Sequence, residues 1–452
     1  MTNWLEDAAQ RGIRYVNSVN ERRVFPEQGA IDALAEFDEP FPQQPASAES
    51  VIALLDDLGG PATVATTGSR YFGFVIGGLL PAAMAASWLM SAWDQNGVLY
   101  ALSPVNAVLE KIALRWVVDA LGLPEETVGG FVTGATMANF TALAAARHHL
   151  LARAGWDVEA QGLFGAPEIK VVVGEEVHVS LLQALMLLGL GRERVIRVPV
   201  DGQGRMLADQ LPEVDAMTIV CLQAGNVNSG AFDPAQAIID KAHEQGAWVH
   251  VDGAFGLWVM AAPAYAHLAA GYQAADSFST DGHKWLNVSY DNGIVLCRHE
   301  HALRAAMTVH APYLVENTER QPSHYTPELS RRARGIEIWA ALKSLGREGL
   351  AEMIERNCQL AAHFASGLSA AGFTVHNEVV INQVMVSFGD AEQTLRVIEA
   401  IQKEGTLWAG QSVWHGQTVM RISVSSWATT QADIERCLEA IVTIANQHEK
   451  SH

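Results

Sequence analysis

The feature that most constrains the fold is an alternation, from about residue 129 to residue 297, of short apolar segments with longer segments of helical periodicity. This pattern is typical of a mostly parallel β-sheet that is covered by helices on both faces. One intervening segment, 234–245, has clear helical periodicity. Six apolar segments are predicted strands: 169–173, 195–200, 218–222, 248–252, 276–280 and 293–297.

A second pattern follows a long helical stretch at 332–345. Predicted strands at 379–388 and 418–424 alternate with predicted helices at 392–403 and 431–447, which indicates a small α+β domain. The first fifty residues end in FDEPFPQQPASAES, a stretch rich in proline and acidic residues that resists helix and sheet formation. We therefore expect an N-terminal arm at 1–95, a large α/β domain at 96–345 and a small α+β domain at 346–452.

The charge balance excludes several classes of partner. The chain has 30 basic and 50 acidic residues and a net charge of −20, which repels nucleic acid and anionic membranes. The four cysteines are scattered without zinc-ligand spacing, so no metal site is predicted and buried thiols in a reducing cytoplasm are expected. The first fifteen residues lack the apolar core of a signal peptide.

One charge-free segment, residues 71–93, is long enough to span a bilayer. Gly77, Gly78 and Pro81 within it instead predict a loop that enters a helix at its first turn. We expect a buried segment near a subunit interface or an active-site wall, and no membrane association.

Lys284 lies in SFSTDGHKWLN, directly after a predicted strand and between His283 and Trp285. A lysine that forms an imine must be partly desolvated so that its neutral amine is accessible. On its own, this residue is better explained as an ordinary surface lysine whose ammonium group reaches water, and the functional interpretation depends on the other motifs.

Asp252 ends the apolar strand in WVHVDGAFG, and ligands of open α/β sheets bind at the carboxyl ends of strands. A buried carboxylate there requires a cationic partner, which a protonated pyridine nitrogen would supply. The alternative is an aspartate that caps the following turn with Gly253.

The segment GGFVTGATMANFTAL predicts a strand, a turn of small residues around Gly134 and Thr136, and a long alanine-rich helix. Small residues allow backbone N–H groups to approach a phosphate at the positive end of a helix, although a capped turn has the same pattern. His178, just after a predicted strand, is either a residue that stacks on a planar ring or a hydrogen-bonded polar side chain.

The order and spacing of these motifs resemble those of the pyridoxal 5'-phosphate (PLP)-dependent group II amino-acid decarboxylases, from about residue 71 to residue 445. DGHKWLNVSYDNG and WVHVDGAFG are the most specific segments. The resemblance implies PLP fold type I, the aspartate-aminotransferase-like fold. In that fold a large α/β domain with a mostly parallel seven-stranded sheet precedes a small C-terminal α+β domain. It also implies a homodimer with active sites at the subunit interface.

The resemblance also assigns roles to residues. Lys284 matches the lysine that forms the Schiff base with PLP, Asp252 the aspartate paired with the pyridine nitrogen, and His178 the histidine stacked on the ring. Ala254 matches a small residue packed near the cofactor. The remaining matches surround the phosphate, with the last one reaching it from a neighbouring subunit: Ala135, Thr136, Asp281, His283 and Ser330.

Two segments bear on the reaction. HAPYL, residues 310–314, resembles the start of the loop whose tyrosine protonates the carbon left after CO2 departs, so Tyr313 is the candidate acid. The polar residues after it are expected to close as a lid, and SRRARGIEIWAALKSLGREGL resembles the family's arginine-rich helix. The chain departs from the family at Val227, commonly threonine, at Gly253, frequently alanine, and in a lid shorter than in the animal aromatic decarboxylases.

The predicted function is decarboxylation of an L-amino acid to its amine and CO2. An aminotransferase or carbon–carbon lyase of the same fold is the alternative, with Arg421 as a carboxylate clamp or a structural ion pair. A PLP-binding protein without catalysis is a further alternative. The substrate stays open, because an acidic one would need a cation such as Arg70, whereas aromatic residues of the predicted pocket wall favour an apolar one: Tyr71, Phe72, Phe74 and Trp93.

Overall fold

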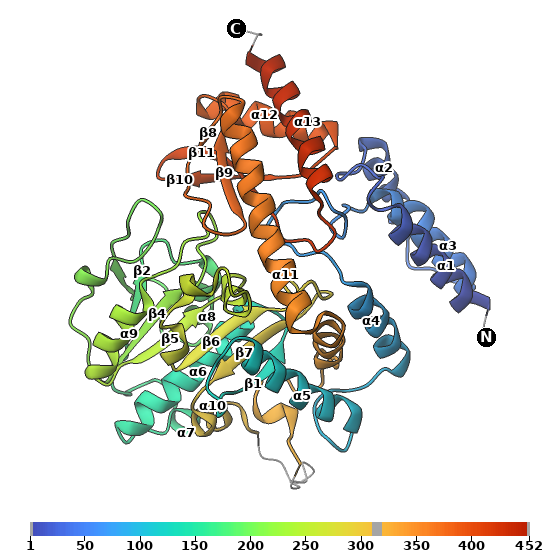
Figure 1. Cartoon of the computed structure of the whole chain (residues 1–452). Helices are drawn as coiled ribbons and strands as arrows, with labels where there is room; N and C mark the ends of the chain where they lie inside the picture. Colours follow the sequence, from blue (N-terminus) through green and yellow to red (C-terminus); the bar gives the residue numbers. More distant parts are fainter. Residues whose placement is uncertain (1–2, 310–318, 450–452) are drawn as a thin grey trace. The chain divides into compact units, whose positions relative to one another are not determined.

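The computed structural model describes residues 3–309 and 319–449 (Figure 1), and the chain divides into two compact units. Unit 1 consists of Met1–Gly78, Leu360–His376 and Gln383–His452. Unit 2 consists of Leu79–Gln359 and Asn377–Asn382. The domain boundaries expected at residues 95 and 345 stay predictions.

Unit 2 contains a seven-stranded sheet with the strand order β1-β7-β6-β5-β4-β2-β3. Strand β7 runs antiparallel to both of its neighbours, and the pairs β6–β5, β5–β4, β4–β2 and β2–β3 are parallel. The predicted mostly parallel sheet is therefore confirmed, and each of the six predicted strands overlaps an observed one. The strands are β1 (Val128–Val132), β2 (Lys170–Gly174), β3 (Ile196–Val198), β4 (Thr218–Gln223), β5 (Trp248–Asp252), β6 (Ser277–Asp281) and β7 (Gly293–Cys297).

Helix α6 (Ala135–Arg153) packs across β1, β5, β6 and β7, with α8 (Val179–Leu187) and α10 (Glu300–Met307) beside it (Figure 1). Alanine favours the helix and its small side chain lets α6 lie close to the sheet. The apolar residues shared by α6, α8 and the sheet include Leu143, Leu150, Val173, Leu185 and Ile219. The other helices of this unit are α4 (Pro81–Trp93), α5 (Pro104–Ala120), α7 (Val158–Gln161) and α9 (Ala235–Glu244).

Unit 1 contains a four-stranded antiparallel sheet of order β10-β11-β9-β8. Its strands are β8 (Thr374–Val375), β9 (Gln383–Ser387), β10 (Gly410–Trp414) and β11 (Gln417–Ser423). Helices α12 (Ala391–Glu404) and α13 (Gln431–Glu449) pack against each other, and α12 also packs against β11. The predicted strand at 379–388 is shorter than expected, and β8 and β10 were not predicted.

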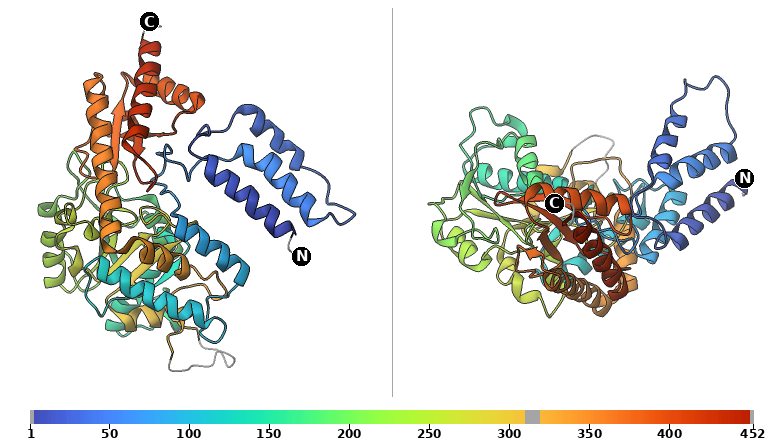
Figure 2. Two further views of the ribbon diagram at one scale, coloured as in Figure 1. Left: turned by 45° about the vertical axis from the view of Figure 1, so that its right-hand side comes forward. Right: turned by 90° about the horizontal axis from the view of Figure 1, so that it is seen from above.

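The N-terminal part of unit 1 is helical, with α1 (Asn3–Ser18), α2 (Gln28–Ala33) and α3 (Ala48–Leu54). Figure 2 shows α1 and α3 side by side, and Arg11 of α1 forms ion pairs with Asp56 and Asp57 just after α3. The acidic, proline-rich stretch between α2 and α3 contains no helix or strand from Asp38 to Ser47, as predicted.

Helix α11 (Gly335–Ala370) belongs to both units and has a non-helical residue, Gly346, at φ 62°. The predicted helix at 332–345 is its first part. Leu55–Gly59 is a short π-helix. Short 3-10 helices occupy Leu34–Phe37, Gly60–Ala62, Ala208–Gln210, Gly256–Ala261, Ala266–Ala269, Tyr272–Ala274 and Pro322–His324.

The charge-free segment 71–93 enters α4 at Pro81, as its sequence predicted. Among the described residues, no helix combines the length and the apolar character needed to cross a bilayer. The expected burial is only partly correct, because Tyr71 and Phe72 are buried whereas Trp88 and Leu89 are 45% and 53% exposed in the single chain. Helix α4 therefore presents an apolar face to its surroundings.

Candidate active site

Lys284 lies three residues beyond Asp281, the last residue of β6. Its Nζ atom is 3.0 Å from Oδ2 of Asp281, whose side chain is almost fully buried. The other oxygen of Asp281, Oδ1, is buried and accepts no hydrogen bond from the described residues. A buried carboxylate oxygen without a donor is costly, so this position is one where an additional donor would be stabilising.

The turn between β6 and Lys284 is fixed by Asn292. Its carbonyl oxygen accepts hydrogen bonds from the backbone N–H groups of Gly282 and His283, at 2.9 and 3.1 Å. Its own backbone N–H donates to Nδ1 of His283 at 3.0 Å. Burial lowers the pKa of His283, so the ring is neutral near pH 7 and carries its proton on Nε2. This Nε2–H group lies on the side of Asp281, 3.6 Å from Oδ1.

Gly134, which precedes α6, lies against this turn. A Cβ atom added to Gly134 would be 3.1 Å from the His283 ring and 3.6 Å from Oδ1 of Asp281. A Cβ atom added to Gly293, the first residue of β7, would be only 2.4 Å from the Cα atom of Gly134. Because Gly134 and Gly293 lack side chains, the backbone at the start of α6 lies close to Asp281 and His283. Ala135 and Thr136 form the first turn of that helix.

Asp252 ends β5, the strand that is paired with β6. Its Oδ1 atom accepts a hydrogen bond from the backbone N–H of Ala254 at 3.2 Å. The carbonyl oxygen of Ala254 in turn accepts from the backbone N–H of Asp281 at 2.9 Å. A Cβ atom added to Gly253 would be 2.6 Å from Cβ of Leu257, so this position is packed too closely for a side chain.

Two residues that were not predicted from the sequence, Asn139 and His250, belong to the hydrogen-bond network of Asp252. Asn139 of α6 donates a hydrogen bond from Nδ2 to Oδ2 of Asp252 at 3.0 Å. His250 of β5 bonds through Nε2 to Oδ1 of Asn139 at 2.8 Å. A signal for His250 was present, because it lies two residues before Asp252 and therefore on the same face of the strand.

Two further predicted residues, His178 and Ser330, make hydrogen bonds within the described part of the chain. His178 caps α8, where its Nδ1 atom accepts from the backbone N–H of Ser180 at 3.2 Å. Ser330 is exposed and its hydroxyl accepts a hydrogen bond from Asn96 at 3.1 Å. Tyr313 lies outside the described residues. Its role, and those of His178 and Ser330, stay predictions.

The arginine considered for an acidic substrate is engaged elsewhere. The guanidinium group of Arg70 is buried in unit 1 and donates to the backbone carbonyls of Thr406, Asn20 and Arg22. Arg421 lies in β11 of the same unit, and burial lowers its pKa.

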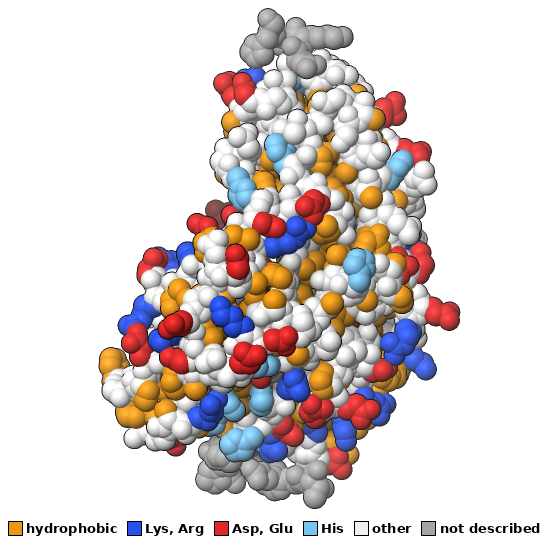
Figure 3. Space-filling model, turned by 60° about the vertical axis from the view of Figure 1, so that its left-hand side comes forward, with side chains coloured by type: hydrophobic (Ala, Val, Ile, Leu, Met, Phe, Trp, Pro, Cys, Tyr) orange, Lys and Arg blue, Asp and Glu red, His pale blue; other side chains and the backbone are white. Residues whose placement is uncertain are grey.

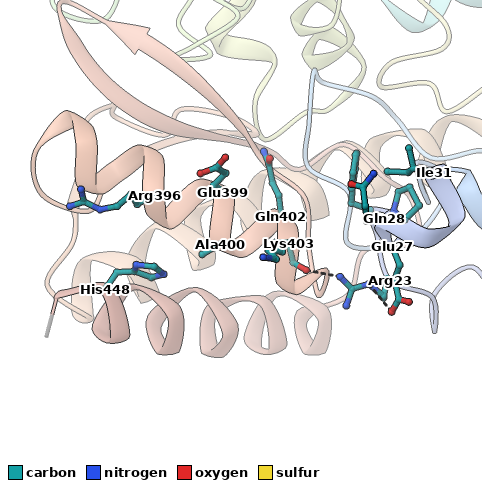
Figure 4. A pocket seen from close by; sticks show the side chains of 12 residues that line it. Arg23, Glu27, Gln28, Ile31, Arg396, Glu399, Ala400, Gln402, Lys403 and His448 are labelled. Atoms are coloured by element: carbon teal, nitrogen blue, oxygen red, sulfur yellow. Dashed lines mark hydrogen bonds and ion pairs between the residues drawn. The ribbon is translucent and has the colours of Figure 1, made fainter. Parts of the chain in front are cut away.

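A pocket of about 790 Å³ lies in unit 1, between the segment before α2 and helices α12 and α13 (Figure 4). Arg23 at its edge donates to the backbone carbonyl of Lys403 at 2.5 Å, and carboxylates such as Glu27 and Glu399 share the wall with the basic residues. None of its lining residues is a predicted site residue. On the molecular face in Figure 3, basic and acidic side chains are interspersed.

Comparison with known proteins identifies the family. Residues 32–388 match the family model described as the pyridoxal-dependent decarboxylase conserved domain. Tryptophan decarboxylase 1 of Oryza sativa is 26% identical over 415 residues, covering 82% of this chain and 79% of that protein. An aspartate 1-decarboxylase of Aliivibrio fischeri is 29% identical over 363 residues, covering 73% of this chain and 65% of that protein. An acidic amino acid decarboxylase of Bos taurus is 28% identical over 315 residues, covering 67% of this chain and 60% of that protein.

Solved structures show the same fold. The Oryza sativa structure titled TDC with PLP and tryptamine superposes with a TM-score of 0.91 at 23% identity, over 99% of this chain and 97% of that one. Mouse CSAD superposes with a TM-score of 0.88 at 23% identity, over 98% of each chain. The chain therefore belongs to the pyridoxal-dependent decarboxylase family. The predicted family, fold class, PLP cofactor and carboxy-lyase class are confirmed.

The residues present fit PLP. The N-terminus of α6, with its close backbone approach at Gly134, suits the phosphate, and the Nε2–H group of His283 adds a donor. Lys284 would supply an amine for the cofactor's aldehyde. Each oxygen of Asp252 accepts one hydrogen bond from the protein and has a further lone pair for a protonated ring nitrogen.

Proposed function

We propose that this protein decarboxylates an L-amino acid to its amine and CO2, with Lys284 holding PLP covalently. The observation that carries the proposal is the pairing of two neighbouring strand ends: β6 leads to Lys284, and β5 ends in the buried carboxylate of Asp252. An amine and a carboxylate on adjacent parallel strands suit the two ends of the reactive axis of PLP, its aldehyde and its ring nitrogen.

Bound PLP supplies an electron-withdrawing ring that accepts the electron pair left when CO2 departs. Asp252 maintains the positive charge on the ring nitrogen by accepting its hydrogen bond. Asp281 holds the amine of Lys284, and His283 with the start of α6 binds the phosphate. Tyr313 donates the proton that the substrate carbon requires, with a relay through His178 as the other route, and the lid that follows Tyr313 excludes water.

A homodimer is part of the proposal. Trp88, Leu89 and Trp93 of α4 are exposed apolar side chains, as are Val105 and Val108 of α5. Exposed apolar groups of this size, with aromatic residues among them, are typical of interfaces between subunits. The exposure of Ser330 also agrees with its predicted contact with the phosphate of a neighbouring subunit's site.

The substrate is proposed to have a neutral side chain, apolar or aromatic. The support is that Arg70, the cation nearest in sequence to the predicted pocket wall, is occupied by three backbone carbonyls. The location is proposed to be the cytoplasm, supported by four cysteines that are all buried and free.

The test is to incubate the PLP-loaded protein with each common L-amino acid and to measure amine, CO2 and keto acid by mass spectrometry. The proposal expects one amine and CO2 in equal amounts. Keto acid in place of the amine would favour transamination, with Arg421 as the next residue to substitute. Equal turnover of aspartate and tryptophan would contradict the neutral side chain.

A further inference from the structure

We propose that Asn139 is the positioning residue for Asp252, and that His250 fixes the orientation of the Asn139 side-chain amide. This inference rests on the proposed role of Asp252 at the ring nitrogen of PLP. Asn139 and His250 are fully buried, and Asp252 is only 6% exposed. None of the three side chains therefore relies on bulk water for its hydrogen bonds.

The direction of the hydrogen bonds follows from the chemistry of each group. An ionised carboxylate only accepts hydrogen bonds, so the atom of Asn139 that faces Asp252 is the donor Nδ2. Its Oδ1 atom accepts from the hydroxyl of Ser279 at 2.6 Å and from Nε2 of His250 at 2.8 Å. The amide therefore has a single orientation that satisfies all of these contacts.

His250 must carry its proton on Nε2 for this arrangement. Burial lowers its pKa to about 4, so the ring is neutral near pH 7 and Nδ1 is an acceptor. The hydroxyl of Ser277 lies 3.0 Å from Nδ1 and donates to it, because the unprotonated Nδ1 can only accept. The Ser277 oxygen also accepts from Nε1 of Trp248 at 2.9 Å. The chain of hydrogen bonds thus runs in one direction from Trp248 through Ser277 and His250 to Asn139 and Asp252.

Helix α6 connects this network to the predicted phosphate site. Asn139 lies four residues after Ala135, so both residues lie on the same face of the helix. The start of α6 is pressed against His283 through Gly134, and one turn later the helix holds the Asp252 carboxylate. One rigid element therefore positions protein groups for both the phosphate and the ring nitrogen.

The experiment compares Asn139→Ala and Asn139→Asp with the wild type. PLP affinity is measured by titrating the PLP-free protein, and the absorbance spectrum of the loaded protein is followed against pH. Loss of a hydrogen bond to a charged group, or a second carboxylate at that distance, is expected to weaken PLP binding about tenfold or more. The midpoint of the pH-dependent spectral change should also move, because Asp252 is no longer held in place.

Asn106→Ala is the matched control, because Asn106 is equally buried in the same unit but lies in α5. It is expected to lower thermal stability without moving the spectral midpoint. Wild-type affinity and midpoint in the folded Asn139 variants would overturn the inference, as would changes that merely follow thermal stability as in Asn106→Ala. If the Asn139 variants do not fold, Ser279→Ala is used instead, because it removes the hydroxyl that donates to Oδ1 of Asn139. A threefold or greater loss of PLP affinity together with a shifted spectral midpoint supports the inference. Wild-type PLP affinity and a wild-type midpoint overturn it.

Asp252→Ala separates this inference from the proposed function. If Asp252→Ala loses affinity and the Asn139 variants do not, only the role of Asn139 fails. If Asp252→Ala binds PLP as the wild type does, the proposed role of Asp252 fails together with the inference.

Discussion

Lys284 and Asp281 form an ion pair in which Nζ lies 3.0 Å from Oδ2. The carboxylate side chain is 2% exposed and the lysine side chain 20%. Removing one partner of a buried pair leaves the other charge without compensation, whereas exposed pairs contribute little because water screens them. The coupling energy between Lys284 and Asp281 should therefore exceed that of an exposed ion pair in the same unit.

A double-mutant cycle of Asp281→Asn and Lys284→Met is expected to give a coupling energy of about 1–3 kcal/mol in the PLP-free protein. The control cycle uses Lys170 and Asp215, an exposed pair at 2.7 Å, and should give less than about 1 kcal/mol. Both are measured by denaturant unfolding. Equal coupling in the two cycles would contradict the interpretation of the Lys284 contact.

Tyr313→Phe removes the proposed proton donor. A positioned general acid contributes about 10²-fold or more, so amine formation should fall by that factor while PLP affinity stays at the wild-type value. Tyr265→Phe, a partly exposed tyrosine elsewhere in unit 2, serves as the control. Amine formation by Tyr313→Phe within twofold of the wild type would exclude this tyrosine as the acid.

Asp276 is held by two histidines. Its Oδ2 lies 3.0 Å from Nε2 of His243, and its Oδ1 lies 2.8 Å from Nε2 of His299. Burial raises the pKa of Asp276, but the hydrogen bonds from these histidines and from the backbone N–H of Val249 outweigh burial and lower the pKa to about 2. The pKa of His243 is raised, chiefly by the same hydrogen bond.

The stability from Asp276 is present above its unfolded pKa near 4 and is lost as the pH falls towards 2. The stability from His243 is present below pH 6.5 and is lost as the pH rises through its raised pKa. Asp276→Asn should therefore be less stable than the wild type at pH 5 by about 2 kcal/mol, with a smaller difference at pH 3. A difference that is constant from pH 3 to pH 8 in urea unfolding would contradict this linkage.

Trp88→Asp is expected to shift the homodimer towards monomer in light scattering after gel filtration, because a charge replaces an aromatic group at the proposed interface. Phe164→Asp is the control, since Phe164 is 99% exposed in the turn that follows α7 of the same unit. The proposed interface is wrong if both variants keep the mass of the wild type, or if the wild type is itself a monomer.

Most strands of unit 2 were predictable because their side chains are buried on both faces, which leaves short apolar segments between polar turns. The exception is β3, in which Ile196 and Arg197 are exposed. Strands β8 and β10 were missed for the opposite reason. Strand β8 has only two residues. Strand β10 (GQSVW) has one glycine, two polar residues and only two apolar ones, so hydrogen bonding to β11 defines it more than its composition does.

The site was predictable where residues are adjacent in the chain, as in the turn from Asp281 to Lys284. Asn139 and His250 were missed because their partners come from other elements, and only the packing of α6 on the sheet brings them together. A weak signal was present in β6, where Ser277, Ser279 and Asp281 alternate on one face of a buried strand. Buried polar side chains require hydrogen-bond partners, so this pattern indicates a hydrogen-bond network. It does not identify which residues of other elements are the partners.

The most direct test of the central claim is to reduce the PLP-loaded protein with borohydride, digest it and locate the pyridoxyl group by mass spectrometry. The account predicts the modification on the peptide that contains Lys284, and none on that peptide in Lys284→Ala. A pyridoxyl group on another lysine of the wild type, or decarboxylation by Lys284→Ala at the wild-type rate, would contradict it.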